Sequence, residues 1–311
     1  MIELQGVSKS FGTLAALTDL TLSIAEGEVF GFIGPNGAGK STTMKILACL
    51  MRPDSGVASV GGFDVTRDGD QIRRIVGYMP DFLGVYDDLT VDEYLQFFAA
   101  AFKIPRARRR AVVDSVLELT DLNEKRHAMV DSLSRGMQQR LGIARVLIHE
   151  PKVLLLDEPA SGLDPRARIE MRSLLTELAR MGKTIMLSSH ILTELAEMCS
   201  SIGIIERGKL LYAGSIQDAY SKARAGERIA VTLEEGGAGP DEVAITLAAH
   251  PSVSSLTREN GSLIVDLHPG AQSHHEIIQA ILASGARIAA FTPRQVKLED
   301  AFLRLTKGAL N

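Results

Sequence analysis

The chain has 311 residues, of which 45% are hydrophobic and 23% are charged, and its formal net charge at pH 7 is −4. This length allows two domains with cores of their own, because single cores rarely grow beyond about 250–300 residues. The slightly acidic charge balance excludes a basic nucleic-acid-binding domain and a disordered chain, so no nucleic-acid partner is expected.

The sequence predicts a protein that starts and stays in the cytoplasm. The N-terminus lacks the basic and apolar regions of a signal peptide, and no apolar run approaches the ~18–20 residues of a membrane span. Cys49 and Cys199 have no metal-type spacing and indicate a reducing compartment. Any membrane association must then occur through a partner.

Residues 2–28 alternate short apolar strands with turns and predict an antiparallel sheet. Phe11 is expected in the loop between two of these strands. An aromatic ring at this place could stack on an adenine or pack in the core, and the residues alone leave both interpretations open.

The next stretch has the pattern G-x-x-x-x-G-K-[ST] between the apolar run Val29–Ile33 and a predicted helix. In this context the pattern indicates a phosphate-binding loop, in which backbone N–H groups and the helix N-terminus meet the phosphates. Lys40 is expected to reach the β- and γ-phosphates, Ser41 to bind Mg²⁺ and Thr42 to bond phosphate. The loop comprises Gly34, Pro35, Asn36, Gly37, Ala38, Gly39, Lys40, Ser41 and Thr42.

The middle of the chain predicts a strand over 75–80 and three helices. Thr90 and Glu93 have capping-box spacing at the start of the first helix, the second covers 106–119, and the third covers 137–149 after a loop at 133–136. The run Arg106–Arg110 is expected to be a solvated helix end, with a docking patch as the alternative.

Two carboxylates follow the apolar run Val153–Leu156, which predicts a strand buried on both faces of a parallel sheet. Ligands bind at the carboxyl ends of such strands, and a buried carboxylate needs a compensating cation or proton. We therefore expect Asp157 to bind Mg²⁺ and Glu158 to act as the base for an attacking water, with a helix N-cap pair as the alternative.

A second buried strand, 184–190, ends in His190, which we expect to contact the γ-phosphate, although a lone histidine is more often structural. A helix over 166–180 precedes this strand. A hairpin around Arg207–Gly208 is expected to close the first domain near residue 215.

The last hundred residues predict a linker at 216–226 and a small domain over 227–311. Its expected order is β-α-β-β-α-β plus a final helix at 298–305, with a hairpin turn at Asn260–Gly261, which is typical of a ferredoxin-like module. The pair His274–His275 is expected to start a helix in solvent rather than bind a metal.

Residues 1–215 resemble the ATP-binding subunits of ABC transporters. Gly34–Thr42 is similar to the Walker A loop, Val153–Glu158 to Walker B, Leu133–Gly136 to the signature loop, Ser161–Asp164 to the D-loop and His190 to the H-loop. The resemblance implies an α/β P-loop NTPase core, with a mostly parallel sheet covered by helices on both faces. It also implies an antiparallel β subdomain, a helical subdomain at about 88–150, and Phe11 as the aromatic residue that stacks on adenine.

The chain departs from the family pattern at two places. The signature loop has Arg135 and Met137 where the family has Gly and Gln, and Asp81 stands where the family has the Q-loop glutamine. Arg135 either adds a cation near the phosphate or points into solvent. Asp81 can still bind Mg²⁺, and it is expected to alter either the affinity for the metal or the link to the partner.

The resemblance further implies a head-to-tail homodimer with two ATP sites, in which Ser134, Gly136 and Asp164 of one copy contact the nucleotide held by the other. Lys40, Glu158 and His190 would be the catalytic residues, with ATP and Mg²⁺ as cofactors. The expected function is the motor of a separate membrane permease on the cytoplasmic face, for export, since 298–306 resembles the ending of drug- and polysaccharide-type exporter subunits. The alternative is a soluble ABC ATPase acting on ribosomes or nucleic acid.

Overall fold

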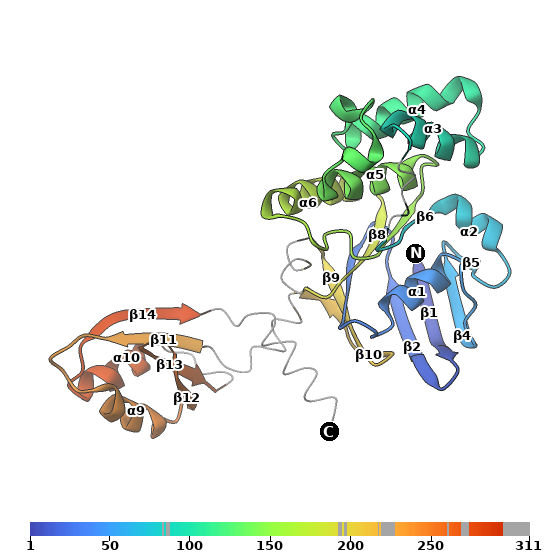
Figure 1. The fold of residues 1–311 in the computed structure, drawn as a ribbon. Helices are drawn as coiled ribbons and strands as arrows, with labels where there is room; N and C mark the ends of the chain where they lie inside the picture. Colours follow the sequence, from blue (N-terminus) through green and yellow to red (C-terminus); the bar gives the residue numbers. More distant parts are fainter. Residues whose placement is uncertain are drawn as a thin grey trace. The chain divides into compact units, whose positions relative to one another are not determined.

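The structure is a computed structural model, and it describes residues 1–82, 84, 88–191, 195, 198–216, 218, 228–259, 261–268 and 274–294. The chain divides into two compact units, Met1–Ile216 and Gln217–Asn311 (Figure 1). Within the described ranges, no helix combines the length and the apolar character needed to cross a membrane. The proposed linker, apart from its first residues, and the proposed final helix lie outside the described residues.

A six-stranded sheet forms the centre of the first unit, in the order β10-β9-β3-β8-β7-β6. All neighbouring strands run parallel except β10, which pairs antiparallel with β9. The mostly parallel sheet predicted from the sequence is therefore confirmed. Its strands are β3 (Val29–Ile33), β6 (Val76–Met79), β7 (Val153–Leu156), β8 (Thr184–Ser189), β9 (Ser201–Glu206) and β10 (Lys209–Ser215).

Both faces of this sheet are buried, as the uninterrupted apolar run of β7 predicts. Val153 and Leu155 share one core with the helix α1 (Lys40–Leu47). Successive side chains alternate across a strand, so Leu154, which is also fully buried, faces the other side. There it lies close to Gly77 and to the backbone of Val146 in α5 (Arg135–Leu147).

A second, antiparallel sheet of four strands packs against α1, in the order β2-β1-β4-β5. Phe11 was predicted in a loop, but it is the last residue of β1 and pairs with Leu14. The reason is the tight turn between them, where Gly12 adopts a φ of 59° and lets both strands continue to the turn. The strands are β1 (Ile2–Phe11), β2 (Leu14–Ile24), β4 (Ser55–Val60) and β5 (Phe63–Asp64).

The helical part of the unit consists of α3 (Val91–Ala101), α4 (Arg106–Leu119) and α5, with short 3-10 turns at Asn123–Lys125 and Val130–Ser132. Figure 1 shows α3 and α4 on the far side of α5 from the sheet, and α6 (Pro165–Arg180) beside α5. The predicted capping box is present, because Thr90 Oγ1 accepts from Glu93 N and Glu93 Oε2 accepts from Thr90 N.

Two local predictions were wrong. Residue 75 was expected to open a strand, but it ends a short helix, α2 (Gly69–Ile75), whose seven residues include only two apolar side chains, Ile72 and Ile75, too few to establish a helical period. The signature residues Arg135 and Gly136 were expected in a loop, but they form the first turn of α5. The helix begins earlier because Ser134 is its N-cap, with Oγ accepting from Met137 N at 3.3 Å.

The second unit has the order β-α-β-β-α-β and an antiparallel sheet in the order β12-β13-β11-β14, which is the ferredoxin-like topology. Its core takes side chains from both helices, including Val243 and Ile277, so both helices cover one face of the sheet, as Figure 1 shows. The elements are β11 (Arg228–Leu233), α9 (Pro240–Ala248), β12 (Val253–Glu259), β13 (Ser262–Leu267), α10 (His274–Ala283) and β14 (Ile288–Arg294).

The burial of β7 predicts the effect of a truncation. We expect Leu155→Ala to lower the free energy of unfolding of the first unit by about 2–5 kcal/mol, since it removes a fully buried side chain and leaves a cavity. Leu50→Ala, at a position that is 63% exposed, should change it by less than about 0.5 kcal/mol. Urea denaturation measures both, and equal effects would contradict the assigned core.

Candidate active site

The predicted site residues meet at one edge of the six-stranded sheet. In the parallel registers, Ile33 of β3 pairs with Ser189 of β8, and Leu156 of β7 pairs with Leu187 of β8 and Met79 of β6. The residues that follow these strands are therefore neighbours at the carboxyl edge. They are the loop from Gly34, the pair Asp157–Glu158, His190 and, after Pro80, Asp81.

The glycine-rich loop needs its glycines for close approach as well as for conformation. A Cβ on Gly34 would lie 2.3 Å from the carbonyl oxygen of Ile205, and one on Gly39, whose φ is 110°, would lie 2.6 Å from that of Ala16. Gly34, Ala38 and Gly39 are buried, whereas Pro35, Asn36 and Gly37 are exposed and Ser41 and Thr42 are half-buried. The loop thus folds tightly between β9 and β2, and its tip faces outward.

The loop opens directly into α1, whose N-terminus carries no side-chain cap and no acidic residue in its first turn. The first N–H groups of a helix have no partner within the helix, and they attract anions together with the helix dipole. This end of α1 therefore has the donor chemistry that a phosphate requires.

Lys40, at the start of α1, lies between the loop and the carboxylate of Glu158. Its Nζ donates to the carbonyl oxygen of Gly34 at 2.6 Å and lies 3.3 Å from Glu158 Oε1. Both side chains are buried, so the ion pair is screened little by water.

Ser188, on β8, joins the two carboxylate residues of the neighbouring strand. Its Oγ donates to Asp157 Oδ1 at 2.6 Å and accepts from Glu158 N at 2.9 Å. The backbone N–H of Asp157 continues the β ladder to Met79 O. These bonds fix the Asp157 carboxylate and the backbone of Glu158 at the sheet edge.

His190 contacts the other oxygen of Glu158, with Nδ1 at 2.9 Å from Oε2. Glu158 has a φ of 51°, a left-handed conformation that few residues other than glycine adopt. Its Oε1 is buried and has no hydrogen bond among the described residues, although Lys40 lies within ion-pair distance. The site therefore joins Lys40, Glu158 and His190, three residues from three separate elements.

Asp81 lies at the exposed rim of this cluster. Burial raises the pKa of its carboxyl, and the charges of Asp157 and Glu158 raise it further, whereas Arg135 and His190 lower it. Burial, followed by the charges of Asp157 and Asp81, raises the pKa of Tyr78 to about 12. Asp81 and Tyr78 thus lie close enough to Asp157 to be affected by its charge.

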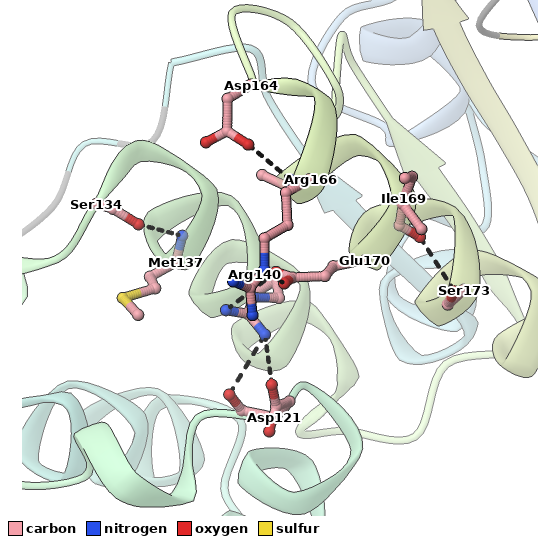
Figure 2. Close-up of polar contacts among 10 residues, drawn as sticks. Asp121, Ser134, Met137, Arg140, Asp164, Arg166, Ile169, Glu170 and Ser173 are labelled. Carbon is pink, nitrogen blue, oxygen red and sulfur yellow. Dashed lines mark hydrogen bonds and ion pairs between the residues drawn. The ribbon is translucent and has the colours of Figure 1, made fainter.

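The signature loop and the D-loop lie next to each other at the starts of α5 and α6 (Figure 2). Ser134 caps α5, and Asp164 caps α6 through Oδ1, which accepts from Ala167 N at 2.9 Å. Gly136 approaches Ala167 so closely that a Cβ would lie 2.9 Å from its side chain. Both caps are exposed.

Arg135 does not simply extend away from the protein, because its guanidinium lies against the backbone of Gly162 in the D-loop. A Cβ on Gly162 would lie 2.6 Å from Arg135 Cζ. The unusual signature residue thus binds the two loops together.

Arg140 connects the same two helices one turn deeper, as Figure 2 shows. Its Nη1 donates to Asp121 Oδ2 at 2.9 Å, and its Nη2 lies 3.7 Å from Glu170 Oε2 on α6. Among the described residues, no hydrogen bond or ion pair joins Ser134 or Asp164 to the phosphate loop. The site residues thus form two separate groups within one chain.

The residues at the sheet edge fit Mg²⁺ and a nucleoside triphosphate. The loop and α1 supply N–H donors and a lysine, and Asp157, Ser41 and Asp81 supply the oxygen ligands that Mg²⁺ prefers. No group of three or more His, Cys, Asp or Glu residues in the described ranges could hold a metal alone. A Mg²⁺ ion bound here would complete its shell with phosphate oxygens.

Ser188 and Tyr78 were not predicted. Both lie inside strands whose apolar neighbours dominated the pattern, so their hydroxyls did not stand out. The one available signal was a pair of serines, 188 and 189, in an otherwise apolar buried strand.

The two bonds of Ser188 predict a measurable loss of stability. Ser188→Ala should lower the free energy of unfolding by about 1–3 kcal/mol, because the buried Asp157 Oδ1 and Glu158 N would each lose a partner. Ser173→Ala on α6 is the control, since its exposed hydroxyl bonds only within its own helix. Equal urea midpoints for the two variants would refute the assigned role.

Comparisons with known proteins agree with this geometry. A family model described as ABC transporter matches residues 17–161. The Nod factor export ATP-binding protein I of Paraburkholderia xenovorans (strain LB400) is 35% identical over 308 residues, covering 98% of this chain and 96% of its own. The linearmycin resistance ATP-binding protein LnrL of Bacillus subtilis (strain 168) is 29% identical over 317 residues, covering 100% and 99%.

Solved structures show the same fold. The ATP-binding subunit of an ABC transporter has a TM-score of 0.64 at 30% identity, over 71% of this chain and 92% of that chain. A dimeric ATP-binding cassette in a post-hydrolysis state, bound to ADP and Pi, has a TM-score of 0.63 at 26% identity, over 70% and 99%. The P-loop NTPase fold predicted from the sequence is confirmed, and the chain belongs to the ABC transporter family as one of its ATP-binding, ATP-hydrolysing subunits.

Proposed function

We propose that two copies of this chain, arranged head to tail, bind Mg²⁺ and ATP at two shared sites, and that hydrolysis drives export through a separate membrane permease. The observation that carries the proposal is the meeting of Lys40, Glu158 and His190 at the sheet edge, where Glu158 lies 3.3 Å from Lys40 and 2.9 Å from His190. A phosphate loop, a carboxylate base and a histidine at one edge suit the attack of water on a terminal phosphate.

Each residue of the sheet edge has a proposed part. The backbone of Gly34–Gly39, with Ser41 and Thr42, holds the phosphates, and Lys40 neutralises charge on them. Asp157 and Ser41 would hold Mg²⁺, which neutralises charge on the phosphates, and Asp81 adjusts the affinity of this site from the rim. Glu158 takes the proton of the attacking water, and His190 orients the Glu158 carboxylate through its 2.9 Å contact.

The second group of residues supports the head-to-tail arrangement. Ser134 and Asp164 are exposed at adjacent helix N-termini, a favourable place for the phosphates of a nucleotide on another copy. A two-fold axis would then complete both sites at once. Dimeric cassettes among the similar structures, one bound to ADP and Pi, support a dimer of this chain.

The names of the relatives support export. They include Nod factor export, linearmycin resistance and probable multidrug transporter proteins, and the alignments extend over 98–100% of this chain. These proteins favour a transporter motor over an ATPase acting on ribosomes. We therefore assign the chain to the cytoplasmic face of the membrane, held there by its permease.

The base assignment is tested by Glu158→Gln, which keeps the size of the side chain and removes its basicity. ATP hydrolysis should fall by at least about 100-fold, since general bases contribute about 10²–10⁴-fold. The variant should retain ATP and elute as a dimer in size-exclusion chromatography, whereas the wild type should not.

Glu124→Gln is the matched control, because Glu124 is exposed in the helical part of the unit and lies outside the site. It should hydrolyse ATP as the wild type does. Normal hydrolysis by Glu158→Gln would remove Glu158 from the role of base and the proposed mechanism with it.

A further inference from the structure

Phe11 has an exposed ring at the end of β1, and β1 pairs with β2, the strand that contacts the phosphate loop. Phe11 ends β1 and is 47% exposed. Two residues earlier on the same strand, Lys9 pairs with Leu17 of β2, and a Cβ on Gly39 of the loop would lie 2.6 Å from Leu17 Cδ2. Because a strand rises about 3.3 Å per residue, Phe11 lies roughly 7 Å along β1 from Lys9, the residue that pairs with Leu17.

Lys9 contacts this ring with its ammonium group. The Nζ atom lies over the ring of Phe11, 5.9 Å from its centroid, which is within the range of a cation–π interaction. The Lys9 side chain is only 17% exposed. A largely buried stem restricts where its charge can lie.

Asp54 anchors that charge. Lys9 Nζ lies 2.5 Å from Asp54 Oδ1, and the other oxygen, Oδ2, accepts from Ser10 N at 2.7 Å. The backbone N–H of Asp54 donates to Ser8 O at 2.9 Å, so Asp54 is itself fixed to β1. The bonds from Lys9 and then Ser10 hold the pKa of the Asp54 carboxyl below its usual range.

We propose that Lys9 is a positioning residue for the adenine base. With Asp54 as its anchor, it occupies one face of Phe11, fixes the ring and withdraws electron density from it, so that the electron-rich purine stacks on the face that Lys9 leaves open. The inference rests on the proposed function and deepens it, because it assigns base recognition to three residues, Lys9, Phe11 and Asp54, of which only Phe11 was expected to take part.

The alternative is a surface ion pair that only stabilises the end of β1. The two interpretations predict different effects on the binding of the base and on the binding of the phosphates. A stacking platform acts on ATP but not on inorganic tripolyphosphate, which has the same phosphate chain and no base. A loss of strand structure next to the loop would weaken both ligands.

The test measures the dissociation constants of ATP and of inorganic tripolyphosphate for the full chain with Mg²⁺ by calorimetry. Lys9→Met removes the charge and keeps an unbranched stem. It should raise the dissociation constant of ATP by about two- to fivefold, the usual range of an exposed cation–π contact, and leave that of tripolyphosphate unchanged. Asp54→Asn, which keeps an acceptor for Ser10 N, should raise the dissociation constant of ATP by a smaller factor. Lys152→Met is the control, because Lys152 is exposed and precedes β7, at the end of the strand away from the site. It should change the dissociation constant of neither ligand.

A double-variant cycle completes the test. Phe11→Leu should weaken the binding of ATP but not of tripolyphosphate. Adding Lys9→Met to it should cause no further loss of ATP affinity, because the ring is gone. Equal weakening of both ligands by Lys9→Met, no effect on either, or a full second loss in the Phe11→Leu background would overturn the inference while ATP binding stands. If the wild type fails to bind ATP, the proposed function itself is wrong.

Discussion

The rest of the site depends on the contacts that the Glu158 carboxylate makes with Lys40 and His190. This carboxylate is buried, and ions transferred from water to a protein interior lose several kcal/mol of solvation unless other groups compensate. Lys40 at 3.3 Å and His190 at 2.9 Å provide this compensation, and Ser188 fixes the backbone N–H of the same residue. Lys40 follows β3 through the phosphate loop, whereas Ser188 and His190 lie at the carboxyl end of β8, so the carboxylate is held only when β3, β7 and β8 are in register. The strand register that defines the fold therefore also positions the proposed catalytic base.

In the proposed dimer, the parallel sheet supplies one half of each site. Its carboxyl edge gathers the phosphate loop, the carboxylates and the histidine. The signature and D-loop residues lie elsewhere, at the N-termini of α5 and α6. There Arg140 and the contact of Arg135 with Gly162 bind the two helices into one surface. In the proposed dimer this surface closes over the nucleotide of the other copy. Arg135, which departs from the family pattern, would then stiffen the approaching surface as well as add charge to it.

The sequence predicted what periodicity and motif spacing encode. The buried parallel strands, the phosphate loop before α1, the capping box at Thr90 and the ferredoxin-like order of the second unit all follow from local patterns, and the structure has them. Local patterns did not predict α2, which has too few apolar residues to show a helical period. They also predicted a start of α5 after Arg135, which the helix includes. They also missed contacts between residues distant in sequence, such as Ser188 with Asp157 and Lys9 with Asp54, because such contacts depend on strand register.

The central claim, that an active site is complete only between two copies, is tested most directly by mixing two inactive variants. Lys40→Ala damages the phosphate loop, and Ser134→Arg damages the signature end of α5. In a head-to-tail dimer, each mixed pair has one site with both lesions and one with neither. An equimolar mixture should therefore recover up to about a quarter of the wild-type ATP hydrolysis, since half of randomly formed dimers are mixed. A mixture as inactive as its two components would contradict the shared site.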